Sequence, residues 1–164
     1  MMDDFFRAEV ALLLARQGLL PDAEAALCLL EPTEETWSSP EVLRIKGAIA
    51  EVNGNLAAAE ARYLDAVAVA ERQGALFRQL RAATSLAALW VGQGRAAAAQ
   101  ATLAPAYERL SSVRQWSDLR RAADCLEACH RALTTAADLL DDDGPSEPRG
   151  AASDTDRPAA AFDA

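Results

Sequence analysis

Apolar residues recur along the chain with the 3.6-residue period of amphipathic helices, in segments separated by glycines. Gly18, Gly54 and Gly94 each follow one such segment and precede another. Glycine is common just past a helix C-terminus, so these positions are read as helix ends. The apolar spacing predicts an all-α fold with seven helices. We expect them at residues 5–17, 21–30, 40–53, 56–73, 75–93, in a segment that begins after Gly94, and from Ser117 onward.

The same side-chain types return at fixed offsets from the three glycines, which are 36 and 40 residues apart. A small residue lies seven positions before each glycine, an alanine five after, a large apolar residue nine after and another apolar residue twelve after. These positions are Ala11, Gly47 and Ala87; Ala23, Ala59 and Ala99; Leu27, Tyr63 and Leu103; and Leu30, Ala66 and Ala106. Such a repeat predicts helical hairpins that cross closely at the small residues and stack side by side. We therefore expect three hairpins and a terminal capping helix, with the first helix of each hairpin lining an open concave face.

The helical pattern is interrupted at two places. Pro105 falls inside the sixth helix, and its ring is expected to kink or split that helix near Ala104. From residue 138 to residue 164 the chain holds eight carboxylates, two arginines and three prolines, with few large apolar side chains. A segment of that composition buries too little surface to offset its ordering entropy. The predicted organisation is a helical repeat domain at 1–137 and an acidic disordered tail at 138–164.

Charge and apolar character narrow the classes of partner. The chain has a formal net charge of −9 and shows no basic patch interleaved with aromatic residues, so we expect no direct binding of nucleic acid. The most apolar stretch, Val10 to Leu20, is interrupted by Arg16, Gln17 and Gly18, so we expect no membrane span. The beginning of the sequence lacks the pattern of a secretory leader, and the three cysteines suit a reducing compartment. The predicted location is the cytoplasm.

Residues with catalytic or metal-binding chemistry are few. Cys125 and Cys129 share a helix face beside His130, but three such ligands leave a tetrahedral zinc site incomplete, and the cysteines are interpreted as small buried hydrophobes. His130 is the only histidine, and the chain has no phosphate-binding loop of the G-x-x-x-x-G-K-[ST] type. We therefore predict neither enzymatic activity nor a bound cofactor or metal.

The repeat resembles the tetratricopeptide repeat (TPR) family. The matching positions are Leu86, Ala87, Trp90, Ala99, Leu103 and Ala106; Gly47, Ala59, Tyr63 and Ala66; and, more loosely, Ala11, Leu14, Ala23, Leu27 and Leu30. The resemblance implies a right-handed α-solenoid. The segments EVLRIKG (41–47), AAAEARYLDAVAVAERQG (57–74) and LRAATSLAALWVGQGRAAAAQATLAP (80–105) are also similar to the C-terminal TPR-like region of large bacterial regulators. Those regulators carry an NTPase module and a cyclase or DNA-binding domain, and this second resemblance implies a regulatory scaffold.

Placing the TPR pattern on the chain assigns Arg44, Glu51, Arg81 and Thr84 to the concave face and Arg78 to its rim. Arginines there can hold a partner's carboxylates through paired hydrogen bonds, although the alternative is that they are ordinary solvated helix residues. The predicted function is a non-catalytic scaffold that binds another protein or peptide in bacterial signalling or transcription regulation. Replacing Arg44 and Arg81 together is expected to weaken partner binding without unfolding the protein.

The sequence leaves two questions open: whether the chain acts alone and whether it forms a homodimer. The chain is either a free-standing adaptor or a self-associating remnant of a larger ATP-dependent regulator or cyclase, without activity of its own. Phe5 and Phe6 are near the open N-terminal end of the predicted array, where a second copy can cover them in a homodimer.

Overall fold

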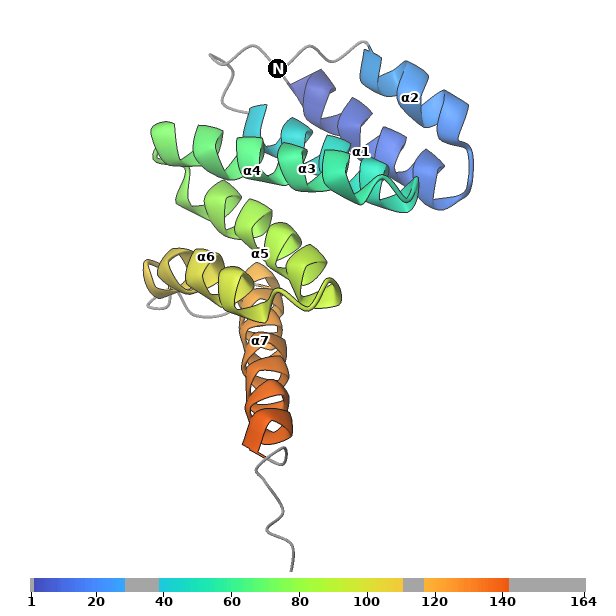
Figure 1. The fold of residues 1–164 in the computed structure, drawn as a ribbon. Helices are drawn as coiled ribbons and strands as arrows, with labels where there is room; N and C mark the ends of the chain where they lie inside the picture. Colours follow the sequence, from blue (N-terminus) through green and yellow to red (C-terminus); the bar gives the residue numbers. More distant parts are fainter. Residues whose placement is uncertain (1, 29–38, 111–116, 142–164) are drawn as a thin grey trace, which may run out of the picture.

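The computed structural model describes residues 2–28, 39–110 and 117–141, and all regular structure in these ranges is helical (Figure 1). The all-α prediction is therefore confirmed. The helices in chain order are α1 (Met2–Arg16), α2 (Leu20–Cys28), α3 (Ser39–Val52), α4 (Leu56–Arg72), α5 (Leu76–Gly92), α6 (Ala96–Glu108) and α7 (Ser117–Asp141).

The turn between α3 and α4 illustrates why the helices end at the predicted glycines. Gly54 has a φ of +75°, a left-handed conformation that costs glycine little because it has no Cβ. Its amide donates to Glu51 O at 2.9 Å, and the Asn55 amide donates to Ala50 O at 2.9 Å, which satisfies carbonyls at the end of α3. Asn55 Oδ1 then accepts a hydrogen bond from the Ala58 amide at 3.1 Å and caps α4.

The structure differs from the sequence prediction at Pro105 and near the end of α7. Helix α6 runs from Ala96 to Glu108 with Pro105 inside it, so the helix is not split near Ala104, and the other expected outcome, a kink, stays a prediction. Pro105 is exposed and lies three residues before the end of α6, where its ring removes only one backbone hydrogen bond. Helix α7 continues to Asp141, beyond the predicted domain boundary at residue 137. The remaining tail, residues 142–164, lies outside the described residues, as does the predicted linker at 31–38.

Helices α1, α3, α5 and α7 form a row of neighbours, because α1 contacts α3, α3 contacts α5 and α5 contacts α7. The other helices pack onto this row: α2 on α1, α4 on α3 and α5, and α6 on α5 and α7. Figure 1 shows that α7 projects well beyond the other helices. Only its N-terminal half contributes fully buried side chains to the core.

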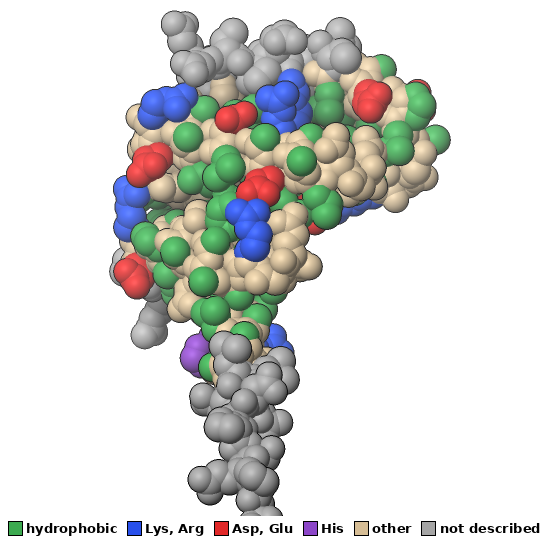
Figure 2. Space-filling view, viewed as in Figure 1, with side chains coloured by type: hydrophobic (Ala, Val, Ile, Leu, Met, Phe, Trp, Pro, Cys, Tyr) green, Lys and Arg blue, Asp and Glu red, His purple; other side chains and the backbone are tan. Residues whose placement is uncertain are grey.

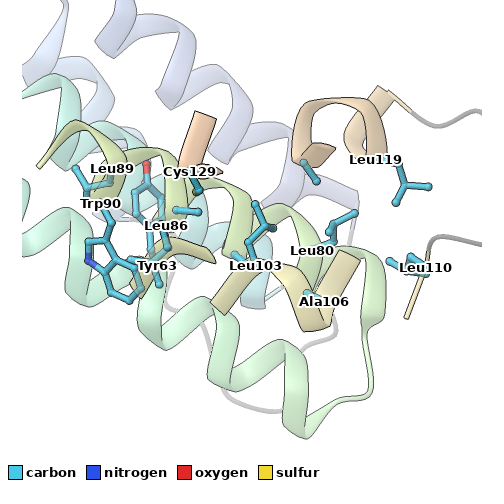
Figure 3. Close-up of a cluster of buried hydrophobic side chains, with 14 of the residues drawn as sticks. Tyr63, Leu80, Leu86, Leu89, Trp90, Leu103, Ala106, Leu110, Leu119 and Cys129 are labelled. Carbon is cyan, nitrogen blue, oxygen red and sulfur yellow. The ribbon is translucent and has the colours of Figure 1, made fainter. Parts of the chain in front are cut away.

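The positions predicted from the repeat form the core contacts between helices. All of them are buried except Leu27, which is half-buried, and Leu30, which lies outside the described residues. Figure 3 shows the largest cluster, with Tyr63, Leu86 and Trp90 toward one end and Leu110 and Leu119 toward the other. The repeat therefore marks the residues that hold adjacent helices together.

A polar contact of Arg95 with Trp90 and Glu60 also joins successive hairpins. The Arg95 guanidinium lies 4.7 Å from the centre of the Trp90 ring, and its Nη1 is 2.9 Å from each carboxylate oxygen of Glu60. Arg95 immediately precedes α6, Trp90 is on α5 and Glu60 is on α4. One side chain thus links three consecutive helices by a cation–π contact and a charge-assisted hydrogen bond.

Candidate functional site

Three adjoining pockets follow the row of helices α1, α3, α5 and α7. A wide pocket of about 470 Å³ is lined by Gly74, Ala75, Leu76, Phe77, Arg78, Arg81 and Asp118. A narrow neck of about 10 Å³, room for about one water, is lined by Arg44, Arg81, Thr84, Ser85, Asp118 and Arg121. A second wide pocket of about 280 Å³ is lined by Leu12, Arg16, Arg44, Ala48, Glu51, Val52, Tyr63, Ser85, Ala88 and Arg121. The neck shares residues with both wide pockets, so the three form one groove, hereafter the arginine groove.

Helix α5 forms the floor of the arginine groove. Phe77, Arg81, Ser85 and Ala88 recur at intervals of three or four residues and therefore lie on one face of the helix. Phe77 and Ala88 are eleven positions apart, which corresponds to about 16 Å along an α-helix. Since α5 contacts both α3 and α7, side chains from those two helices form the sides of the groove.

The groove is positively charged although the whole chain is acidic. The described residues of its lining include five arginines and two carboxylates, and the Glu41 carboxylate that pairs with Arg44 and Arg81 reduces their net charge from +3 to +2, whereas the chain as a whole carries −9. The arginines are Arg16, Arg44, Arg78, Arg81 and Arg121, and the carboxylates are Glu51 and Asp118. On the face shown in Figure 2, over α4 and α6, charged side chains are instead scattered singly or in small groups. The field of the groove therefore favours an anionic ligand.

A buried ion cluster anchors the arginines of the neck. Glu41 is 2% exposed and Arg44 is 7% exposed. Glu41 Oε1 accepts hydrogen bonds from Arg44 Nε at 2.9 Å and Nη2 at 2.6 Å, and it lies 3.2 Å from Arg81 Nη2. Arg44 Nη2 is also 4.0 Å from a carboxylate oxygen of Glu9 on α1. Burial alone lowers the pKa of Arg44, but its hydrogen bonds and charge interaction with Glu41 raise that pKa above the usual value. Arg44 therefore contributes to folding as well as to the groove.

Arg78 and Arg81 stand together where the wide pocket meets the neck. Arg81 Nε lies 3.7 Å from Asp118 Oδ2, which is an ion pair between α5 and α7 but too long for a strong hydrogen bond. Burial lowers the pKa of Arg78, the attraction of Glu41 opposes that effect, and the nearby Arg81 lowers the pKa further. The carboxylates of Glu41 and Asp118 offset part of the repulsion between the two guanidinium groups.

The other two predicted site residues have different roles. Glu51 is exposed, and its Oε2 accepts a hydrogen bond from the Tyr63 hydroxyl at 2.8 Å. Burial raises the pKa of Tyr63, and the hydrogen bond to Glu51 raises it further. Thr84 is 6% exposed, and its hydroxyl donates to Leu80 O at 2.7 Å within α5. Glu51 is therefore accessible at one end of the groove, whereas the hydroxyl of Thr84 is engaged by its own helix.

The structure brings all five predicted site residues, Arg44, Glu51, Arg78, Arg81 and Thr84, to the lining of one groove. The sequence prediction missed the contributions of Arg16, Glu41, Asp118 and Arg121. For Asp118 and Arg121 a signal was present, because they flank the apolar stripe of α7 at a spacing of three. If α7 is taken as the first helix of a fourth hairpin, and not only as a capping helix, the repeat pattern predicts that Asp118 and Arg121 face the groove.

The cysteines near the middle of α7 belong to the packing of that helix. Cys129 is buried in the core, and Cys125 is half-buried. Burial raises the pKa of Cys125 to about 11 and also raises that of Cys129. Their interpretation as small packing residues agrees with this burial. Among the described side chains, no group of three or more His, Cys, Asp or Glu residues is placed to hold a metal ion.

Comparison with known proteins gives no match for this chain among family models, curated proteins or solved structures. Within the described ranges, no helix has both the length and the apolar character needed to cross a membrane. The function is therefore inferred from the geometry and charge of the arginine groove.

Proposed function

We propose that this protein is a non-catalytic interaction module whose arginine groove binds an extended, acidic segment of another protein. The observation that carries the proposal is the net charge of +2 that the described groove residues and Glu41 carry together, in a chain whose total charge is −9. A cationic groove on an acidic surface steers anionic segments toward itself and repels them elsewhere. The cations are all arginines, whose planar guanidinium groups can make paired hydrogen bonds to carboxylates.

The proposal includes a TPR-like, right-handed α-solenoid as the architecture. Its three hairpins are α1–α2, α3–α4 and α5–α6, and α7 follows as the capping helix. Two observations support this arrangement: the repeat positions are buried between helices, and the first helices of successive hairpins contact one another. In such an array, the first helices line the concave surface on which partners bind. A role in bacterial signalling or transcription regulation, within the cytoplasm, follows from the resemblance to bacterial regulators and remains a proposal.

The dimensions of the groove define what kind of segment fits. Because the neck has room for about one water, a segment that reaches both wide pockets is expected to fill them with side chains while its backbone passes over the neck. The wide pocket presents Leu76 and Phe77 to an apolar side chain, while Arg78 and Arg81 at its edge suit a carboxylate. We therefore expect the preferred ligand to carry a large apolar side chain next to an aspartate or glutamate.

A peptide-binding experiment tests this proposal. The probe is a fluorescein-labelled ten-residue peptide of aspartate, leucine and alanine, and its affinity is measured by fluorescence anisotropy. The variant R81Q/R121Q removes two groove arginines, and the expected loss is about 1–2 kcal/mol, or about 5- to 30-fold in affinity. Circular dichroism verifies that the variant remains folded.

The matched control is R62Q/R131Q, which removes the same charge from exposed positions outside the groove. The control is expected to bind the probe with nearly wild-type affinity. An equal loss of probe affinity in R81Q/R121Q and R62Q/R131Q would mean that the peptide responds to the net charge of the protein and not to the groove. Equally tight binding of a peptide with lysine in place of aspartate would also contradict the proposal.

Self-association is the alternative function. Phe6 on α1 is 63% exposed, which favours a contact at this end, whereas the side chain of Phe5 lies outside the described residues. A homodimer covering this region stays a prediction. Light scattering over a range of concentrations checks it, and a monomer at every concentration would contradict it.

A further inference from the structure

Helix α1 presents an apolar stripe on the side that faces away from its neighbours. Val10 is 49% exposed and Leu13 is 56% exposed, and Phe6, one turn before Val10, is 63% exposed. The three residues follow one another at intervals of four and three and therefore share one face of the helix. The opposite face is buried against α2 and α3 through Ala8, Ala11, Leu12 and Ala15. We propose that this stripe packs antiparallel against the same stripe of a second copy, with Val10 and Leu13 of each copy at the centre of the contact.

The stripe has the size of a protein interaction site. From their exposed fractions, Val10, Leu13 and Phe6 together offer about 300 Å² of surface, and apolar patches of a few hundred Å² commonly mark such sites. The remaining exposed large apolar residues of the described ranges are spread over several helices and a turn; they are Leu19, Val52, Leu56, Leu64 and Phe77. Two stripes with their polar edges bury about 1,000 Å² in total, the lower limit for a specific interface. We therefore expect a weak dimer with a dissociation constant on the order of 10–100 µM.

The charges beside the stripe select the antiparallel arrangement and its register. Glu9 and Arg16 are seven residues apart and lie along the same edge of the stripe. When Val10 of one copy faces Leu13 of the other, antiparallel helices bring Glu9 of each copy close to the level of Arg16 in the other. The twofold symmetry of such a contact forms this ion pair twice.

Other arrangements of the two helices lose these ion pairs. If the antiparallel helices shift by one heptad so that Val10 faces Phe6, the two Glu9 side chains come together and repel each other. A parallel pair places Glu9 beside Leu14 of the second copy and so leaves it without an opposite charge. The apolar stripe and its charged edge are thus complementary to the same stripe of a second copy in one antiparallel register.

Both charged side chains are accessible for the contact. The side chain of Glu9 is 35% exposed, and its distance of 4.0 Å from Arg44 Nη2 is too long for a hydrogen bond. Arg16 is exposed and forms no ion pair within the described ranges. Arg7, on the other edge of the stripe, comes beside Leu14 of the second copy and meets no like charge there.

Analytical ultracentrifugation of the full-length chain tests the contact. We expect a monomer–dimer equilibrium of the wild type between about 5 and 500 µM. The variant V10Q/L13Q makes two exposed positions of the stripe polar, so it is expected to remain folded by circular dichroism and to dimerise at least about tenfold more weakly. The matched control L56Q/L64Q makes two exposed positions on α4 polar and is expected to dimerise as the wild type does. A wild type that stays monomeric over this range, or equal losses in the two variants, would overturn the inference.

An exchange of the two charges tests the orientation and the register. E9K and R16E each turn both interchain pairs into repulsions, and each is expected to weaken the dimer about tenfold. The double variant E9K/R16E restores opposite charges and is expected to dimerise within about threefold of the wild type. The two positions are about 10 Å apart along their own helix, so a contact within one chain cannot produce this recovery. A double variant no better than the single ones would contradict the antiparallel register.

The acidic probe peptide separates this inference from the proposed function. Val10 and Leu13 do not line the arginine groove, so V10Q/L13Q is expected to lose the dimer and still bind the probe with wild-type affinity. Probe binding by a wild type that never dimerises would refute the dimer and leave the proposed function standing. A dimer that forms as described but binds no probe would refute only the proposed function.

Discussion

Substituting Gly47 tests how closely α3 and α4 cross. A Cβ built at Gly47 lies 2.6 Å from Tyr63 Cε1, 2.7 Å from Tyr63 Cδ1 and 3.2 Å from Ala59 O, whereas carbon atoms in contact are normally about 3.5–4.0 Å apart. The Tyr63 ring cannot easily move away, because it is 1% exposed and its hydroxyl is bonded to Glu51 at 2.8 Å. Overpacking costs about 1–3 kcal/mol, and the 2.6 Å approach to a fixed ring places G47A in the upper part of that range, at about 2–3 kcal/mol, while replacing a helical glycine by alanine stabilises by about 1 kcal/mol.

We therefore expect G47A to lower the free energy of unfolding by about 1–2 kcal/mol. With a denaturant slope of about 2 kcal/mol/M, the midpoint of urea unfolding followed by circular dichroism falls by about 0.5–1 M. The matched control is G92A in α5, where the added Cβ meets no atom within 4 Å, and this variant is expected to gain about 0.5–1 kcal/mol.

A second comparison isolates the steric cause. In a chain that already carries Y63A, the clash partner is absent, so G47A is expected to have little destabilising effect or to stabilise the protein. If G47A and G92A change stability in the same direction, or if G47A remains equally destabilising in the Y63A chain, the close crossing is not the reason for glycine at this position.

Three further predictions follow from the buried polar groups and thiols. R44A is expected to cost about 3 kcal/mol in urea unfolding because it leaves Glu41 buried without its main partner, whereas R81Q is expected to cost about 1 kcal/mol or less; equal costs would contradict the burial argument. Y63F is expected to cost about 1 kcal/mol at pH 7. Because the pKa of Tyr63 is raised in the folded protein, its stabilising contribution is full below about pH 10 and is lost as the pH rises further, so Y63F should unfold with a weaker dependence on alkaline pH than the wild type. Cys125, with its pKa raised to about 11, is expected to react slowly with iodoacetamide at pH 8 in the native protein and quickly after denaturation; rapid native labelling would contradict its burial.

The helical fold was predictable because local signals and packing agree. Glycines close the helices, Asn55 caps α4, and the small and large residues of the repeat meet between helices. At Pro105 the sequence left a kink or a split open, and the structure shows that α6 continues through the proline to Glu108 without a split. The domain boundary was set at residue 137 because the composition changes there, whereas α7 continues to Asp141, so a change in composition does not mark the last turn of this helix.

The groove residues were predictable as positions on helix faces, but their partners were not. The spacing placed Arg44, Arg78 and Arg81 on first helices, and the structure places them along one groove. Sequence spacing alone did not indicate that Glu41 pairs with both Arg44 and Arg81, because that contact depends on how α3 packs against α5. The burial of Arg44 also changes the expected effect of its substitution, which now includes a loss of stability.

The central claim is that the arginine groove binds carboxylates, and the side-chain Nε–Hε signals of its arginines test it most directly. These signals are followed by nuclear magnetic resonance while the unlabelled acidic probe peptide is added to the ¹⁵N-labelled protein. We predict that Arg78, Arg81 and Arg121 shift together with one saturating affinity, while Arg62 and Arg131 remain unchanged. Unchanged groove signals, or equal shifts at all five arginines, would contradict the account.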